Sequence, residues 1–139
     1  MTKDLGFDIE LASGFSEAIG HVKDALKQEG FGILTEIDLQ TAFREKLGRE
    51  FRPYIILGAC NPPLAFSAIN ADPAVGLLLP CNVTIESIGE HRTMVRLTNP
   101  EALLATASLE TSSEMASVAR DASDRMSRVR NTLQQLARG

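Results

Sequence analysis

The apolar residues in the first third of the chain alternate between strand and helix spacing. Residues 7–11 read FDIEL, and this period of two predicts a strand with one buried face. Apolar residues at helical spacing follow, between Ser13 as the expected N-cap and Gly30 as the expected stop. A second strand is predicted over residues 31–37. A short helix comes next, which Asp38 would cap and Gly48 would end.

The middle of the chain predicts one buried strand and one helix. Residues 54–59 form a nearly continuous apolar run, which is typical of a central strand. Asn61 can cap the next helix, and Pro62 suits its first position because the missing N–H has no partner to lose there. Residues 64, 65, 68 and 69 would face the core. The apolar run over residues 76–80 is interpreted as a further strand.

The last third predicts a hairpin and a long helix. Residues 82–87 and 93–97 alternate on either side of Gly89-Glu90 and pair as a hairpin. Asn99-Pro100 opens a short helical turn through Leu104. Thr111 and Glu114 have the spacing of a capping box, ahead of an amphipathic stripe over about residues 112–137.

These elements predict an α+β fold with a mainly antiparallel sheet and the late helix over one face. A chain of 139 residues is expected to form a single domain, with a core over about residues 5–104 and the C-terminal helix over about 112–137.

Charge and composition exclude several classes of protein. The net charge of −4 gives no basic footprint for nucleic acid. Residues 53–71 carry no charge, but their three prolines make a poor membrane span, so we interpret them as buried core. The first residues lack an apolar signal segment, which predicts a cytoplasmic protein whose thiols are kept reduced.

The only two cysteines stand in similar settings. Cys60 lies in LGACNPP and Cys81 in LLPCNV, and each is followed by asparagine and lies near a proline. If the strand that ends at Cys60 neighbours the strand near Cys81, the two sulfurs meet at one site. A pair of thiols can form a transient disulfide, carry a persulfide or bind Cu(I). The alternative is that both cysteines are small core residues.

Three segments together carry a resemblance to a known family. GFGILTEIDL (30–39), FRPYIILGACNPPLA (51–65) and GLLLPCNVTI (76–85) resemble the domain-of-unknown-function family numbered 302. The resemblance implies a TATA-binding-protein-like half-fold, with a curved antiparallel sheet and helices on one side, and it implies a homodimer. It also implies that Asn61-Pro62 and Leu79-Pro80 belong to the scaffold, whereas the cysteines mark one branch. It supplies no catalytic residue and no cofactor.

Candidate site residues follow from the chemistry of these segments. Cys60 would lie at the start of a helix, where the helix dipole lowers a thiol pKa. The amides of Asn61 and Asn82 could bind a ligand, although a helix cap at Asn61 and a bulge or turn at Asn82 explain them better. Tyr54 could line a pocket with its hydroxyl. The C-x20-C spacing is not a zinc signature, the two histidines do not complete one, and no metal site is predicted.

Three hypotheses remain open from the sequence. The first is a thiol site at Cys60 and Cys81, used for redox, sulfur or soft-ligand handling. The second is a homodimeric binding module whose sheet and final helix enclose an apolar pocket for a small molecule, with the cysteines in its lining. The third is a structural or interaction homodimer without chemistry, in which the cysteines are buried. Enzymatic status is left undecided, because no motif for nucleotide binding or hydrolysis occurs.

Overall fold

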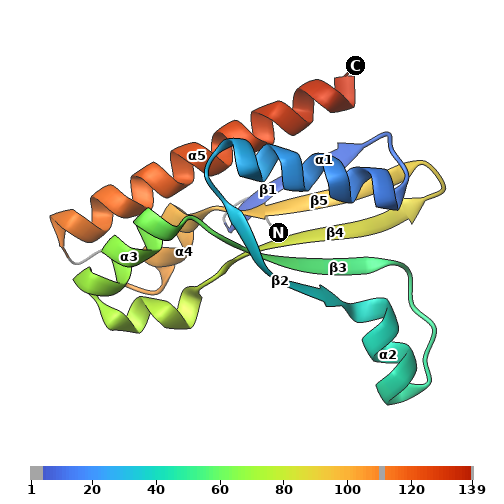
Figure 1. Ribbon diagram of the computed structural model, residues 1–139, viewed down its shortest axis with the longest axis horizontal. Helices are drawn as coiled ribbons and strands as arrows, with labels where there is room; N and C mark the ends of the chain where they lie inside the picture. Colours follow the sequence, from blue (N-terminus) through green and yellow to red (C-terminus); the bar gives the residue numbers. More distant parts are fainter. Residues whose placement is uncertain (1–4, 110–111, 139) are drawn as a thin grey trace.

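The computed structural model describes residues 5–109 and 112–138 and contains one open antiparallel sheet (Figure 1). The strand order is β1-β5-β4-β3-β2, so β1 and β2 are the edges. The α+β class and the antiparallel sheet predicted from the sequence are confirmed. The strands are β1 (Gly6–Leu11), β2 (Gly32–Asp38), β3 (Tyr54–Cys60), β4 (Cys81–Gly89) and β5 (Arg92–Thr98).

Two helices cover one face of the sheet and enclose the main core. The helical elements are α1 (Phe15–Gln28), α2 (Leu39–Leu47), α3 (Pro62–Ala71), the 3-10 helix η1 (Pro73–Leu78), α4 (Pro100–Thr106) and α5 (Ser113–Arg138). Figure 1 shows α1 and α5 lying across the sheet. Alternate residues of the strands, such as Leu57 and Val95, are buried against Leu26 and Met126 of these helices.

The two ends of α1 differ in how well the sequence predicted them. The expected cap at Ser13 is wrong, because Gly14 is the N-cap residue and makes no side-chain cap bond. The Ser13 carbonyl instead accepts a 2.8 Å hydrogen bond from the Thr93 hydroxyl. The expected stop at Gly30 is confirmed, since Gly30 has a φ of 83° and its N–H bonds to the Lys27 carbonyl.

Helix α2 stands away from the rest of the protein, at the opposite end of the sheet from α3 and α4 (Figure 1). Its ends are as predicted, with Asp38 accepting from the Thr41 N–H at 3.0 Å and Gly48 in the left-handed conformation. Its ring contact is local, between Phe43 and Phe51 at 5.1 Å. All of its residues are described, and none of them is buried.

Helices α3, η1 and α4 form a small lobe at the end of the sheet, called the end lobe below. The strand expected at residues 76–80 is wrong, because η1 extends to Leu78 and β4 begins only at Cys81. The Asp72 side chain caps η1 by accepting a hydrogen bond from the Ala74 N–H. Pro73 fits the first position of η1, because the N–H that proline lacks would have no partner within the helix there. Ile69 was expected to face the core but is exposed, whereas Ala68 is buried.

Helix α5 runs from the end lobe back along the sheet. Its expected cap, Thr111, lies outside the described residues, and the Ser112 hydroxyl accepts from the Met115 N–H at 3.0 Å. The predicted stripe is buried at Met115, Met126, Val129 and Leu133, and the expected long C-terminal helix is confirmed. None of the described helices is long and apolar enough to cross a membrane.

The other face of the sheet carries a mixture of apolar and charged side chains. Ile37 is 47% exposed, and Ile56 and Met94 are partly exposed. Glu86 is 6% exposed because Arg52 and Arg96 each bond to one of its carboxylate oxygens. We call this side the open face.

Edge strand β2 is irregular. Its pairing with β3 shifts register between Ile33 and Thr35, and Leu34 in between is exposed. The shift is a β-bulge, in which one residue of the strand has no partner opposite it.

Candidate functional site

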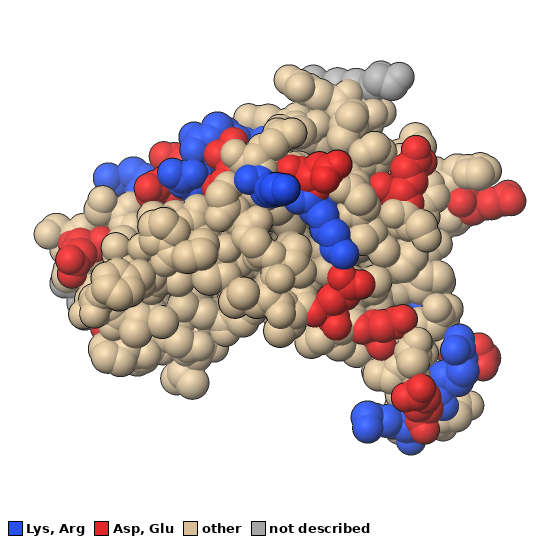
Figure 2. All heavy atoms as spheres, in the orientation of Figure 1, with Lys and Arg blue, Asp and Glu red and all other residues tan. Residues whose placement is uncertain are grey.

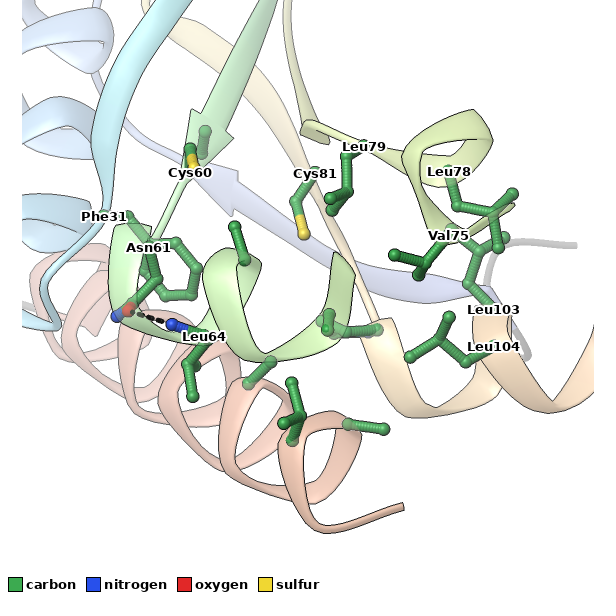
Figure 3. Close-up of a pocket in the computed structure, with 17 residues that line it drawn as sticks. Phe31, Cys60, Asn61, Leu64, Val75, Leu78, Leu79, Cys81, Leu103 and Leu104 are labelled. Carbon is green, nitrogen blue, oxygen red and sulfur yellow. Dashed lines mark hydrogen bonds between the residues drawn. The ribbon is translucent and has the colours of Figure 1, made fainter. Parts of the chain in front are cut away.

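An apolar pocket lies between the ends of β3 and β4, the end lobe and the first half of α5 (Figure 3). Six elements and the loops beside them contribute to it, so it forms only when the end lobe packs against the sheet and α5. It is lined by Phe31, Ala59, Cys60, Asn61, Leu64, Ala65, Ala68, Val75, Leu78, Leu79, Cys81, Pro100, Leu103, Leu104, Val118, Ala119 and Ala122.

The pocket is small and sits beside a second hydrophobic core. Its volume is about 60 Å³. The second core consists of five buried residues of the end lobe and α5, namely Ala68, Val75, Leu104, Met115 and Ala119. A cavity this size exceeds the roughly 10–15 Å³ that one water needs, and most of its lining side chains are apolar. It is therefore packing space that an apolar group could fill.

Asn61 is the one amide among the lining residues, and both ends of its side chain are occupied. It is 8% exposed. Its Oδ1 accepts from the Leu64 N–H at 3.3 Å, which is the cap predicted from the sequence (Figure 3). Its Nδ2 donates to the Glu29 carbonyl at 3.3 Å. Each end of the amide thus has a partner within the protein, and Asn61 has a structural role here.

The Glu29 carbonyl joins three segments beside the pocket. It accepts from Asn61 Nδ2 at the start of α3 and from Arg125 Nη1 of α5 at 3.1 Å. Arg125 is also paired with Asp121 at 3.0 Å. Gly30 follows directly, and a Cβ there would come within 2.9 Å of Asn61 Nδ2. The close approach and the positive φ both require glycine at this position.

The two cysteines do not form a pair, which corrects the expectation that their sulfurs meet. The strands are neighbours as expected, but Cys81 lies opposite Ala59, one residue before Cys60. Neighbouring residues of a strand point to opposite faces, so this register separates the two side chains. Figure 3 shows the Cys81 thiol directed toward α3 and the two thiols not facing each other. Both cysteines are free and partly buried.

The buried environment of Cys81 favours the neutral thiol over the thiolate. Burial raises its pKa to about 11, and the neighbouring Cys60 adds a smaller electrostatic contribution in the same direction. The thiolate is the nucleophile and the metal-binding form of cysteine, and little of it is present at Cys81 near neutral pH. Cys81 therefore resembles a soft apolar side chain in its chemistry.

Asn82 and Tyr54 lie outside the pocket lining. Asn82 is exposed on β4, and its backbone carbonyl accepts from the Thr98 hydroxyl. Tyr54 begins β3, at the end of the strand opposite Cys60, and its ring lies 6.3 Å from that of Phe51. Of the five candidate residues, the structure brings Cys60, Asn61 and Cys81 to the pocket and leaves these two elsewhere.

The three segments that carry the family resemblance meet at Gly58. Gly58 has Thr35 of the first segment on one side and Pro80 of the third on the other. A Cβ at Gly58 would overlap the Thr35 hydroxyl and approach Pro80 Cγ to 2.7 Å. The segments are thus held together by close packing, and the scaffold role expected of Pro80 has a physical basis.

Sequence reasoning missed the side chains that form most of the pocket wall. Leu64 of α3, Leu103 of α4 and Val118 of α5 come from separate helices, and their spacing predicts only apolar faces. A signal was present in the low charge of residues 53–85, which contain Asp72 as the single charged residue. Figure 2 shows the same feature as a nearly uncharged surface over the end lobe, whereas charges gather along α5 and on α2.

Comparison with known proteins identifies the family. A crystal structure of an uncharacterized conserved DUF302 protein from Bacillus stearothermophilus is similar to this chain, with 26% identity and a TM-score of 0.80. The similarity covers 93% of this chain and 98% of that one. No curated protein matches the chain. The family model described as domain of unknown function DUF302 matches residues 7–133, and the chain therefore belongs to the DUF302 family.

Proposed function

We propose that this protein binds a small apolar molecule in the pocket between the sheet and the end lobe. The proposal is carried by the composition of the pocket wall, which is aliphatic or aromatic apart from Asn61 and the two cysteines. Small-molecule sites are concave and mostly apolar, and they often lie where separate layers of a fold meet. The proposal keeps the location expected from the sequence and replaces the thiol pair with a hydrophobic site.

The end lobe supports the proposal because it can yield to a ligand. A volume of about 60 Å³ is below the roughly 150 Å³ of an engineered cavity that binds benzene. Helix α3 contributes one buried residue, Ala68, so little burial opposes a small outward movement. A ligand of that size would therefore bind with a shift of α3 and η1.

Methyl NMR with xenon and benzene tests the proposal. Protein labelled at leucine and valine methyl groups is expected to show shifts at Val75, Leu78, Leu103 and Val118, which line the pocket. Ala65→Leu would fill the pocket from α3 and reduce these shifts, whereas Ala105→Leu on the exposed side of α4 would leave them unchanged. Absence of pocket shifts with both xenon and benzene, or equal shifts in Ala65→Leu, would overturn the proposal.

A second candidate function is self-association, which the family resemblance implied, and we propose the open face as the surface for it. Exposed Ile37 and partly exposed Ile56 and Met94 favour it, because a sheet face that carries several apolar side chains gains by burial against a partner. Helix α2, which buries none of its residues, would add contacts beyond the end of the sheet. The homodimer would leave the pocket free.

Sedimentation velocity at several concentrations tests the homodimer. Ile56→Lys is expected to shift the distribution toward monomer, and Leu77→Lys on the end lobe is the control. A monomer at all concentrations, or a dimer that Ile56→Lys does not weaken, would rule out this face. Neither candidate function assigns a reaction, and the cytoplasmic location stays a prediction.

A further inference from the structure

We propose that the pocket selects an uncharged hydrocarbon group, an alkyl chain or small arene that brings no hydrogen-bonding atom inside. This inference rests on the proposed function and names the class of ligand for the same site. The pocket wall has few hydrogen-bonding groups and no charged side chain, and the pocket volume is small.

The one side-chain amide of the wall already makes a hydrogen bond to the protein at each end. Asn61 uses Oδ1 for the Leu64 N–H and Nδ2 for the Glu29 carbonyl. Pro100, the first residue of α4, has no N–H to donate. A ligand hydroxyl placed in the pocket would lose its bonds to water and find few replacements.

Cys81 does not change this conclusion. Burial holds its pKa at about 11, and the thiol is neutral near pH 7. A neutral S–H is a weak hydrogen-bond donor and a polarisable group that packs well against hydrocarbon. Its thiol points toward α3, so it contributes a soft surface to the pocket (Figure 3).

Charge around the pocket disfavours an anionic ligand. Apart from the thiols, none of the lining residues is ionisable. Asp72, the single charged residue between positions 53 and 85, is acidic. Arg125 lies near Asn61, but it is held by the Asp121 carboxylate and the Glu29 carbonyl. A carboxylate would therefore enter an apolar wall without a cation to pair with.

The outer surface of the end lobe is apolar, like the pocket wall. Phe66 is 72% exposed on α3 and Leu77 is 90% exposed on η1. On the face drawn in Figure 2 this lobe is almost free of charged side chains. A hydrocarbon approaching the pocket would thus meet an apolar surface before it reaches the apolar interior.

Three probes of one shape test the selectivity, namely benzene, phenol and benzoate, each titrated against the methyl-labelled protein. Benzene is expected to shift the pocket methyls. Phenol is expected to bind at least about tenfold more weakly relative to benzene than its transfer from water to octanol would suggest, because its hydroxyl stays unpaired. Benzoate is expected to give no pocket shift at a hundredfold higher concentration than benzene needs.

Matched serine variants test the same point from the protein side. Cys81→Ser places a hydroxyl at the wall and is expected to raise the affinity for phenol relative to benzene severalfold. Ala105→Ser on the exposed side of α4 is the control, because Ala105 does not line the pocket and the ratio is expected to stay unchanged. A change in the ratio confined to Cys81→Ser supports the inference.

The outcomes distinguish failure of binding at the pocket from failure of its selectivity for hydrocarbon. If neither xenon nor any of the three probes shifts the pocket methyls, the proposed function fails and the selectivity fails with it. If benzoate or phenol binds as well as benzene, the binding site stands and the selectivity is overturned. If Ala105→Ser and Cys81→Ser change the ratio equally, the assignment of Cys81 to the wall is overturned.

Discussion

Gly58 of β3 lies so close to Pro80 that a Cβ on the glycine would approach Pro80 Cγ to 2.7 Å. The Thr35 side chain closes the other side of the same position. The contact joins β2, β3 and the segment before β4, and none of the three can move away without opening the sheet beside the pocket.

Gly58→Ala is therefore expected to lower the free energy of unfolding by about 2 kcal/mol or more, because overpacking at a rigid contact displaces backbone. Urea denaturation measures the loss. The control is Gly32→Ala in β2, where a Cβ would meet nothing within 4 Å. Similar stability of Gly58→Ala and Gly32→Ala would contradict the close packing.

Asn61→Ala is expected to cost about 1–2 kcal/mol, since it removes the cap of α3 and leaves the Leu64 N–H without its partner. Asn82→Ala, at the other Cys-Asn sequence, is expected to change stability by less than about 0.5 kcal/mol because Asn82 is exposed. Chemical denaturation of both variants separates the two asparagines. An equal loss would show that the cap contributes little.

Alkylation against pH tests the state of Cys81. In Cys60→Ser, which leaves one thiol, the iodoacetamide rate is expected to be low near neutral pH. It should rise about tenfold per pH unit toward the pKa of about 11. Mass spectrometry follows the modified fraction. A rate that levels off near pH 8 would mean that the thiol ionises as readily as an exposed one.

The same pKa has a consequence for stability at high pH. The folded state holds the Cys81 proton up to about pH 11, whereas the unfolded state releases it near the ordinary value of 9.0. Stability from this group is present below pH 9 and is lost as the pH rises toward 11. Cys81→Ala is expected to show a smaller loss of unfolding free energy over this range. An identical pH dependence in both proteins would contradict this.

Glu86 gives the opposite dependence at low pH. Burial alone would raise the pKa of its carboxyl, but hydrogen bonds from Arg96 and Arg52 outweigh burial and hold that pKa below its ordinary value of 4.5. Its contribution to stability is present above pH 4.5 and is lost as the pH falls below it.

Glu86→Gln is thus expected to be less stable than the wild type at pH 7, by about 2 kcal/mol. The difference should shrink on acidification to pH 3. Thermal denaturation of both proteins across this range makes the comparison, and Glu90→Gln at the exposed hairpin tip serves as the control. A difference that stays constant with pH would mean that the pKa of Glu86 is not lowered.

Local signals in the sequence predicted most elements of the fold. Asp38, Gly48 and Asn61 act through residues within four positions of themselves, so their caps are visible in the sequence. The apolar run at 76–80 misled because a short apolar segment fits a strand or a helix equally well. Asp72 as the cap and Pro73 at the first position are the signals that indicate the helical turn η1 here.

The candidate site was harder to predict because it depends on register and on distant contacts. Whether Cys60 and Cys81 meet is decided by a shift of one residue between β3 and β4, which the alternation of either strand cannot reveal. The pocket wall also needs α4 and α5, which follow β5 in the chain. Helix α5 packs against α3, and α4 packs against α5 and η1. The sequence indicated the location through its cysteines and lack of charge, but not the arrangement.

The irregular edge strand β2 has a consequence for behaviour at high concentration. A regular edge offers unpaired backbone groups to another chain and invites growth of the sheet into aggregates. In β2 the register shift between Ile33 and Thr35 interrupts that row, and Asp38 ends the strand with a charge. The bulge therefore protects a chain that exposes Leu34 and Ile37 from fibrous association, and straightening it would make concentrated solutions prone to aggregate.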